Sequence, residues 1–257
     1  MSTVKTPEYR DSAGKTLAEY PHPNVAVDTV ALTYDENRGL EALVVGGPDD
    51  WALPGTFLHV GEVLADAVQR ALQEKAGVHG LKPWQLKVFD ALRRDRRGWI
   101  LSVAHVCVIP VKQLADRDPD RTRLVPADDP GTLIYDHPKM IQLALEDLRA
   151  RYDVEPDPDH LLGDTFTLRD LALLHGAVAG EPITPQELDT FRRYMQSRLD
   201  PTGKTVEGGG RPAKLFRRKP GATAGRLTAE LRTPESTPAW RRRSRASTDR
   251  RTSGREG

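Results

Sequence analysis

Apolar residues in the first half of the chain gather in short runs that predict β-strands. Two runs rich in β-branched residues, 25–34 and 40–45, are separated by a polar turn, which indicates a hairpin. Two further runs, 84–92 and 99–109, are joined by a charged turn and predict two more strands. The segment 112–131 is rich in Asp, Arg and Pro, which favours an exposed loop.

An amphipathic helix is predicted between these pairs of strands. A loop at 53–61 leads into residues 63–76, and Gly77 then supplies a suitable C-terminal cap. Strands in this order, with a helix after a loop, favour an α/β sandwich. The predicted fold class is therefore α/β (α+β) with a mixed sheet.

Beyond residue 137 the apolar positions recur every three or four residues, as they do on the buried face of a helix. Pro138 suits the first turn of one such helix. Its apolar face carries Ile141, Leu145, Leu148 and Tyr152. A second helix is predicted from about Thr167 to about Ala179, with Asp170 in the capping-box position and Gly180 after its end.

The clearest local signal in this half is the start of a third helix. Thr184 is placed as its N-cap, Pro185 at its first position, and Glu187 three residues after the cap. Its buried face is predicted to hold Leu188, Phe191, Met195 and Leu199. Its outer face is predicted to carry Gln186, Asp189, Arg192, Arg193 and Gln196.

A hairpin is predicted after this helix, with 204–206 pairing with 214–218 around a glycine-rich tip. Helix, turn, capped helix and hairpin in this order are typical of a winged helix-turn-helix that binds double-stranded DNA. Arg and Gln of such a helix contact bases, and cations of the hairpin hold phosphates. The candidate DNA-binding residues are Gln186, Thr190, Arg192, Arg193, Gln196, Arg211, Lys214 and Arg217. For any single one of them, an ordinary solvated surface is the alternative.

The formal net charge of +1 conceals two oppositely charged parts. From Arg211 onward, 14 Lys and Arg stand against 4 Asp and Glu, which gives +10, whereas the preceding residues have 24 against 33, which gives −9. A polyanionic partner is therefore expected at the C-terminal part. Residues 219–257 hold few apolar side chains, which predicts a disordered basic tail. The cluster 240–245 in this tail either adds phosphate contacts or is only solubilising.

Cysteine usage and hydropathy indicate the compartment. Cys107 is the only cysteine and lies in an apolar run, which excludes an intrachain disulfide and predicts a small buried side chain. The first ten residues lack the apolar core of a signal peptide, and no run approaches the roughly 20 apolar residues of a membrane span. We therefore expect a cytoplasmic protein with a flexible arm over 1–21.

Residues 56–78 carry the strongest chemical signal. They resemble the Nudix box, G-x5-E-x7-R-E-U-x-E-E-x-G-U, where U is aliphatic. The positions that match are Glu62, Arg70, Leu72, Glu74, Gly77 and Val78. Thr56 replaces the opening Gly, and Ala71 and Lys75 replace two Glu residues that share one helix face and bind Mg²⁺ in Nudix hydrolases. Ala71 offers no oxygen, and Lys75 places an ammonium where a dication needs anionic oxygens.

The altered box predicts a Nudix-like pocket that binds a nucleotide, requires no cofactor or metal, and does not hydrolyse its ligand. The candidate ligand-binding residues are Gly55, Thr56, Phe57, Glu62, Arg70, Glu74 and Lys75. No residue is predicted to be catalytic or to bind a metal.

A degenerate Nudix box followed by a winged helix resembles the Nudix-related transcriptional regulators, the NrtR family, over roughly residues 22–218. Further similar segments follow in the family's order: 96–105, 135–138, 166–168, 191–193 and 210–213. The resemblance implies a Nudix-like α/β/α sandwich at 22–137, then a linker helix and winged helix at 138–218. It also implies a homodimeric repressor of NAD metabolism genes that binds a palindromic operator, with ADP-ribose as the effector.

Two other functions fit the same residues. One is an active Nudix hydrolase of ADP-ribose-like nucleoside diphosphates with an accessory DNA-binding domain. The other is a regulator of this architecture that responds to a sugar or another nucleotide. The residues leave open whether the effector releases or strengthens DNA binding.

Overall fold

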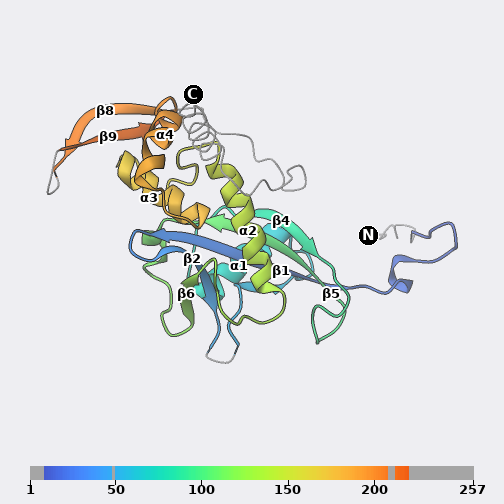
Figure 1. Ribbon diagram of the computed structural model, residues 1–257. Coiled ribbons are helices and arrows are strands. Elements are labelled where there is room, and N and C mark those ends of the chain that lie inside the picture. The colour runs from blue at the N-terminus through green and yellow to red at the C-terminus, as the bar shows by residue number, and fades with distance from the viewer. Residues whose placement is uncertain (1–8, 48–49, 208–211, 220–257) are drawn as a thin grey trace, which may run out of the picture.

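The computed structural model describes residues 9–47, 50–207 and 212–219. This part of the chain forms two units, a larger one built on a six-stranded sheet and a smaller one built on a three-stranded sheet (Figure 1). A short 3-10 helix, η1 (Leu17–Glu19), precedes the larger unit. Most of the predicted N-terminal arm is thus described, whereas nearly all of the predicted tail lies outside the described residues.

The larger sheet is mixed, as predicted. Its strand order is β4 (Trp84–Phe89), β5 (Ile100–Val108), β1 (Asn24–Asp35), β2 (Gly39–Val45) and β6 (Thr122–Pro126), and β3 (Gly55–Phe57) pairs with β1 off this path. β1 and β5 run parallel, and the other neighbours run antiparallel. The predicted hairpin of β1 and β2 is confirmed, with Leu32 opposite Ala42.

The predicted exposed loop at 112–131 is wrong in part. It contains a 3-10 helix, η2 (Val111–Leu114), and the strand β6, which pairs antiparallel with β2. β6 has only two aliphatic residues in its five positions, so it leaves no apolar run in the sequence. β2 supplies its hydrogen-bond partners, and Val125 is buried in the core on one face of the sheet. Tertiary pairing therefore overrides the polar composition of this segment.

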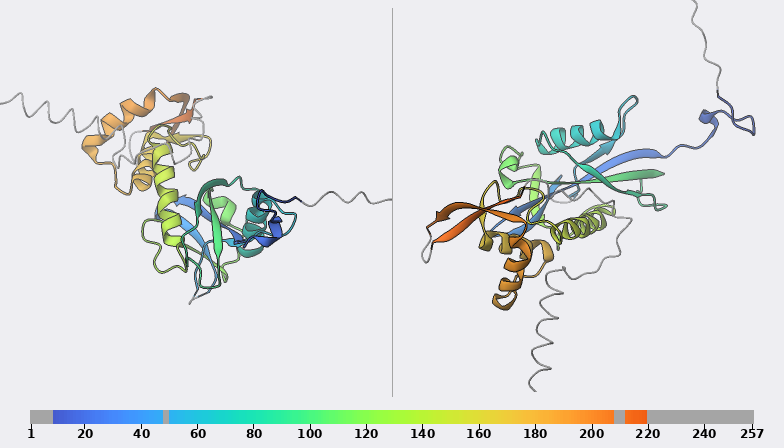
Figure 2. Two further views of the ribbon diagram at one scale, coloured as in Figure 1. Left: turned by 90° about the vertical axis from the view of Figure 1, so that its right-hand side faces the viewer. Right: turned by 90° about the horizontal axis from the view of Figure 1, so that it is seen from above.

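Two helices cover the sheet from opposite sides, as Figure 2 shows in the view from above. α1 (Leu64–Ala76) buries Val68 and Leu72 against the face that carries Ala31 and Leu43. It ends as predicted at Gly77, whose φ of 67° is the left-handed conformation of a C-terminal cap.

α2 (His137–Tyr152) covers the other face. The four residues predicted for its apolar side, Ile141, Leu145, Leu148 and Tyr152, are all buried. They share one core with Val30 and Leu32 of β1. The helix that the sequence assigns to a linker is therefore also the third layer of the sandwich.

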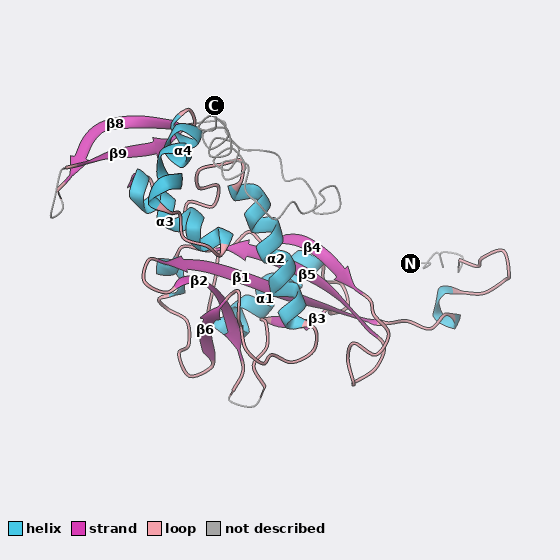
Figure 3. Ribbon diagram, in the orientation of Figure 1, coloured by secondary structure: helices cyan, strands magenta, loops and turns pink. Residues whose placement is uncertain are grey.

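The smaller unit contains β7 (Phe166–Thr167), α3 (Leu168–Ala179), α4 (Pro185–Gln196), β8 (Leu199–Val206) and β9 (Ala213–Arg218). Its sheet has the order β7-β9-β8, and the β8–β9 hairpin projects from the two helices (Figure 3). This is the predicted winged helix-turn-helix. Strand β8 begins five residues before the predicted start at 204, because Gly203 (φ 75°) is accommodated as an irregularity within the strand.

Local capping sets where α3 and α4 begin. Thr184 accepts a hydrogen bond from the Glu187 amide, and the Glu187 carboxylate accepts one from the Thr184 amide at 3.0 Å. Thr167 and Asp170 form the same box on α3. On α4, Phe191 and Met195 are buried as predicted, whereas Leu188 is only partly buried.

The two units meet along α2 and α3. Leu174 and Val178 of α3 belong to the core that α2 forms with the large sheet. The His175 ring makes edge contacts with Tyr152 of α2 and Phe191 of α4, at centroid distances of 5.3 and 5.1 Å. A continuous packed path therefore joins the large sheet to α4.

Candidate ligand pocket and nucleic-acid interface

A cavity of about 210 Å³ lies where β1, β3 and α1 meet the start of α2. Four of the predicted ligand-binding residues line it: Gly55, Thr56, Phe57 and Lys75. The other three predicted residues do not. Glu62 and Arg70 lie beside the cavity in an ion pair, and Glu74 is exposed.

The ion pair of Glu62 and Arg70 holds the loop of the Nudix box. Arg70 Nε and one terminal nitrogen each donate to the Glu62 carboxylate at 2.9 Å. The same guanidinium donates to Thr56 Oγ1 at 3.0 Å and to the Phe57 carbonyl at 2.9 Å. Hydrogen bonds from Arg70, and then from the His59 amide, lower the pKa of Glu62 to about 2. These two positions, which match the motif, therefore shape β3 and the loop after it.

The box does not fit the Mg²⁺ site of a Nudix hydrolase. Ala71 is buried in the core beneath α1, and the Lys75 ammonium donates to the Gly55 carbonyl. The Glu62 carboxylate is occupied by Arg70. No three His, Cys, Asp or Glu side chains gather as a metal site within the described residues.

A buried carboxylate forms the inner wall of the pocket. Asp28 of β1 accepts a hydrogen bond from Ser102 Oγ, and His137 Nε2 lies 3.5 Å from its other oxygen. His137 Nδ1 accepts from the Leu53 amide at 2.9 Å, so the ring proton is on Nε2 and faces Asp28. Burial raises the pKa of Asp28, but His137, Ser102 and the charge of Arg94 outweigh it, so the pKa is lowered overall.

Asp28 also explains why residue 55 is glycine. A Cβ on Gly55 would lie 1.9 Å from Asp28 Oδ1 and 2.8 Å from the Val27 carbonyl oxygen. Only a residue without a side chain lets β3 pair this closely with β1.

Arg97 forms the opposite wall. Its guanidinium carbon lies 5.0 Å from the ring centre of Phe57 and 5.1 Å from that of Tyr135. It donates to the buried Asp95 carboxylate at 2.6 Å, and this hydrogen bond is the main cause of a lowered Asp95 pKa. Two aromatic rings and a fixed cation therefore face the cavity.

Sequence reasoning missed this half of the pocket. The turn 93–98 and the segment 135–138 were recognised, but no ligand-binding role was given to Arg94, Arg97, Tyr135 or His137. A usable signal was Asp28, an acidic residue within a β-branched strand, since a buried carboxylate needs partners.

Lys75 is the residue of the box that can still act on a ligand. Its ammonium has three donors, and the Gly55 carbonyl occupies one of them. Burial lowers the pKa of Lys75, with Arg97 acting in the same direction and Asp28 in the other. The arrangement suits a phosphorylated ligand with a flat ring, since cations and aromatic faces are both available.

The outer face of α4 carries the predicted DNA-binding residues. Gln186, Arg192, Arg193 and Gln196 are exposed, and Thr190 is half-buried. The nearest carboxylate to Arg192 is Asp189 at 3.8 Å, and Arg193 Nε donates to the Asp189 carbonyl at 3.2 Å. Both guanidinium groups thus keep donors for an outside partner.

The hairpin adds two exposed cations, Lys214 and Arg217. They are three positions apart on β9, so they point to opposite faces of the hairpin. Arg211 lies outside the described residues. No helix in the described part of the chain is long and apolar enough to cross a membrane.

Comparisons with known proteins agree with both units. Residues 158–218 match the model of the NrtR DNA-binding winged helix domain. The chain is 27% identical over 213 residues to the ADPR responsive transcriptional repressor NtrR of Acinetobacter baylyi. The aligned residues make up 78% of this chain and 84% of that protein. It is 30% identical over 126 residues to an ADP-ribose pyrophosphatase of Methanocaldococcus jannaschii. Here the aligned residues make up 48% of this chain and 73% of the relative.

Among solved structures, Shewanella oneidensis NrtR in complex with a 27mer DNA matches with a TM-score of 0.63 and 30% identity. The match covers 77% of this chain and 94% of that chain, so it includes both units. The chain therefore belongs to the NrtR family of Nudix-related transcriptional regulators.

Proposed function

We propose that the protein is a transcriptional repressor that binds DNA through α4 and the hairpin. Its effector is ADP-ribose or a related nucleotide, which binds in the Nudix pocket. The observation that carries this proposal is the packing of a winged helix against the unit that contains the Nudix pocket, in which Ala71 and Lys75 stand at the metal positions of the motif. The name of the Acinetobacter relative supports the effector, and the Shewanella NrtR–DNA complex supports the partner.

We place the pyrophosphate of the ligand next to Lys75. Lys75 stands at the motif position of a Glu that binds Mg²⁺ in Nudix hydrolases and its ammonium lies beside the Gly55 carbonyl, so it can neutralise phosphate charge without metal. The flat base or ring of the ligand then meets the Phe57 and Tyr135 side of the cavity. In this arrangement the ligand binds and is not cleaved, because Ala71 and Lys75 cannot bind a metal and no cluster of carboxylates or other metal ligands takes their place within the described residues.

The proposed DNA target is a palindromic operator of NAD metabolism genes in the cytoplasm, bound by a homodimer. Two copies of α4 in adjacent major grooves would lie about 34–36 Å apart, which sets the spacing of the half-sites. Base contacts are assigned to Gln186, Thr190, Arg192, Arg193 and Gln196. Phosphate contacts are assigned to Arg211, Lys214 and Arg217.

The deciding experiment measures binding of the full chain to its own upstream DNA by fluorescence anisotropy, with and without ADP-ribose. We expect specific binding at physiological salt and a change in affinity when ADP-ribose is added. DNA binding that ADP-ribose does not change would refute the effector, and absence of sequence-specific binding would refute the repressor.

Hydrolysis of ADP-ribose is the second candidate function, favoured by the similarity to an ADP-ribose pyrophosphatase and by the retained Glu62 and Glu74. Chromatography of ADP-ribose incubated with the protein and Mg²⁺ separates the two. Intact ligand supports the repressor without hydrolase activity, and steady production of AMP supports the enzyme.

The role of Lys75 is tested by calorimetry without metal. Lys75→Glu is expected to weaken ADP-ribose binding by about ten-fold or more, because a charge-assisted contact becomes a repulsion. Lys87→Glu, an exposed change on β4, is the matched control. Equal affinities of the two variants would show that Lys75 serves only the Gly55 carbonyl.

A further inference from the structure

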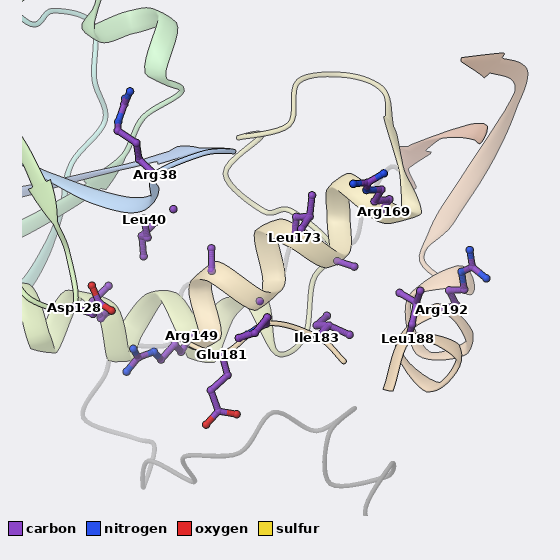
Figure 4. Close-up of a pocket in the computed structure, with 17 residues that line it drawn as sticks. Arg38, Leu40, Asp128, Arg149, Arg169, Leu173, Glu181, Ile183, Leu188 and Arg192 are labelled. Carbon is purple, nitrogen blue, oxygen red and sulfur yellow. The ribbon is translucent and has the colours of Figure 1, made fainter. Parts of the chain in front are cut away.

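A second, larger cavity of about 580 Å³ lies between the two units (Figure 4). Its walls come from the turn between β1 and β2, the C-terminal half of α2, the exposed side of α3, and the first half of α4. It shares no lining residue with the Nudix pocket. Its volume is in the range of small-molecule sites, which are frequent at the junction of two domains.

This cavity, here called the junction groove, has an apolar floor. Leu40 and Leu145 line it from the larger unit, and Leu173, Ile183 and Leu188 line it from the smaller one. Leu173 stands out because 40% of it is exposed, whereas Leu171 and Leu174 on the same helix are buried. An exposed leucine in a concave surface of this size favours an apolar ligand group.

The rim of the junction groove is basic. Four arginines line it, Arg38, Arg149, Arg169 and Arg192, against two acids, Asp128 and Glu181. Arg38 is paired with Glu41, and Arg149 donates to the Val178 carbonyl. Within the described residues no carboxylate pairs with Arg169, and the nearest to Arg192 is 3.8 Å away.

We propose that the junction groove binds an amphipathic organic anion, a hydrocarbon ring or short chain with one carboxylate, sulfonate or phosphate group. The hydrocarbon part would cover Leu173 and its apolar neighbours, and the anion would pair with Arg169 or Arg192. An uncharged ligand would leave these guanidinium groups unused, and a fully polar anion would leave the leucines exposed.

Such a ligand acts on DNA binding through Arg192. This residue lies on the outer face of α4 and also lines the groove, so an anion in the groove and a DNA phosphate or base compete for one guanidinium. The groove therefore provides a second input to the protein, separate from the Nudix pocket. This consequence rests on the proposed DNA-binding function, whereas the binding site itself does not.

The test uses 8-anilinonaphthalene-1-sulfonate, an aromatic sulfonate that fluoresces when it leaves water. The full chain is expected to bind it saturably, with one site per chain. Leu173→Asp and Arg169→Glu should each weaken binding by about ten-fold or more, since each removes one half of the recognition. Both changes are at positions that are not fully buried, and thermal melting verifies that the variants fold.

Two matched controls define the site. Leu17→Asp introduces the same charge at an exposed leucine far along the chain, and Lys87→Glu makes the same kind of charge reversal on β4; neither should change probe binding. Equal weakening by the controls would overturn the site. N-phenyl-1-naphthylamine, the uncharged analogue, should bind more weakly, and equal binding of the two probes would overturn the role of the arginines.

Sedimentation tests the competing occupant, a second copy of the chain. If Leu173→Asp and Arg169→Glu dissociate a dimer, the groove is a subunit interface and the proposal fails. ADP-ribose calorimetry on the same variants distinguishes the two proposals. Unchanged ADP-ribose binding together with lost probe binding supports two separate sites. Probe binding that these variants retain overturns the groove, whether or not ADP-ribose binding is lost.

Discussion

The Nudix pocket and the outer face of α4 use arginine in opposite ways. Around the pocket, each arginine is tied to a carboxylate of the same unit, Arg70 to Glu62, Arg94 to Asp136 and Arg97 to Asp95. On α4, the contacts of Arg192 and Arg193 are with Asp189 of their own helix, and both side chains are exposed. Paired arginines build a fixed cavity for a small ligand, whereas exposed ones remain available to a polyanion.

The winged-helix unit also contains a buried ion pair, similar to the arginine–carboxylate pairs around the Nudix pocket. Its removal is expected to have the largest effect on the free energy of unfolding. The fully buried Asp157 carboxylate accepts from Arg218 at 2.7 Å, from Tyr152 Oη and from two backbone amides. Asp157→Ala should lower the free energy of unfolding by about 3–5 kcal/mol, because it leaves the largely buried Arg218 guanidinium without its carboxylate and three further donors without an acceptor.

Urea unfolding measures this loss. Asp164→Ala, an exposed change on the same connector, should stay within about 0.5 kcal/mol of wild type. If the two variants are equally stable, the winged-helix unit does not depend on its buried pair, and the contrast with α4 disappears.

The exposed arginines of α4 are expected to affect DNA and not stability. Arg193→Ala or Arg192→Ala should cost about 1–3 kcal/mol of operator affinity and relax sequence preference. Stability should change by no more than about 0.5 kcal/mol. Arg217→Ala on the hairpin should instead weaken all sequences alike and reduce the salt dependence.

Anisotropy titrations at several salt concentrations test these three variants. Wild-type affinity in all of them would place the DNA-binding surface elsewhere. A large loss of stability in Arg192→Ala or Arg193→Ala would mean that these arginines are structural, like those of the pocket.

The contact between the units should make stability depend on pH. Burial lowers the pKa of His175 to about 4, although the hydrogen bond to the Pro156 carbonyl acts in the other direction. Because the folded pKa lies below the unfolded value, the stabilisation is complete above about pH 6.5 and is lost as the pH falls toward 4. We expect a loss of up to about 2 kcal/mol between pH 7 and 5.

The measurement is the urea midpoint of wild type and His175→Phe across this range. Phe keeps an aromatic ring between Tyr152 and Phe191 but cannot titrate. The variant should lose most of the pH dependence, and an equal slope in both proteins would assign it to other groups, His105 among them.

The smallest expected effect comes from the start of α4. Thr184→Ala removes the side-chain acceptor of the Glu187 amide and should cost about 1 kcal/mol of unfolding free energy. Thr184→Ser keeps the acceptor and should remain close to wild type. If both variants match wild type in urea unfolding, packing of Phe191 and Met195 alone positions the helix.

The sequence alone predicted the elements whose causes are local. The capping boxes of Thr167 and Thr184, the Gly77 cap and the apolar face of α2 all depend on residues within a few positions of each other. The Nudix motif likewise fixed the positions of Arg70 and Lys75 on one helix. These features set the two units and the family to which the chain belongs.

Tertiary structure alone decided the pocket and the edge of the sheet. Asp28, Gly55, Arg97 and His137 are far apart in the sequence and meet only because β3 and β5 both pair with β1, and because α2 starts beside them. β6 became a strand because β2 offered hydrogen-bond partners. Burial, pairing and pKa at these positions depend on non-local contacts, and a pattern within one segment of sequence does not contain them.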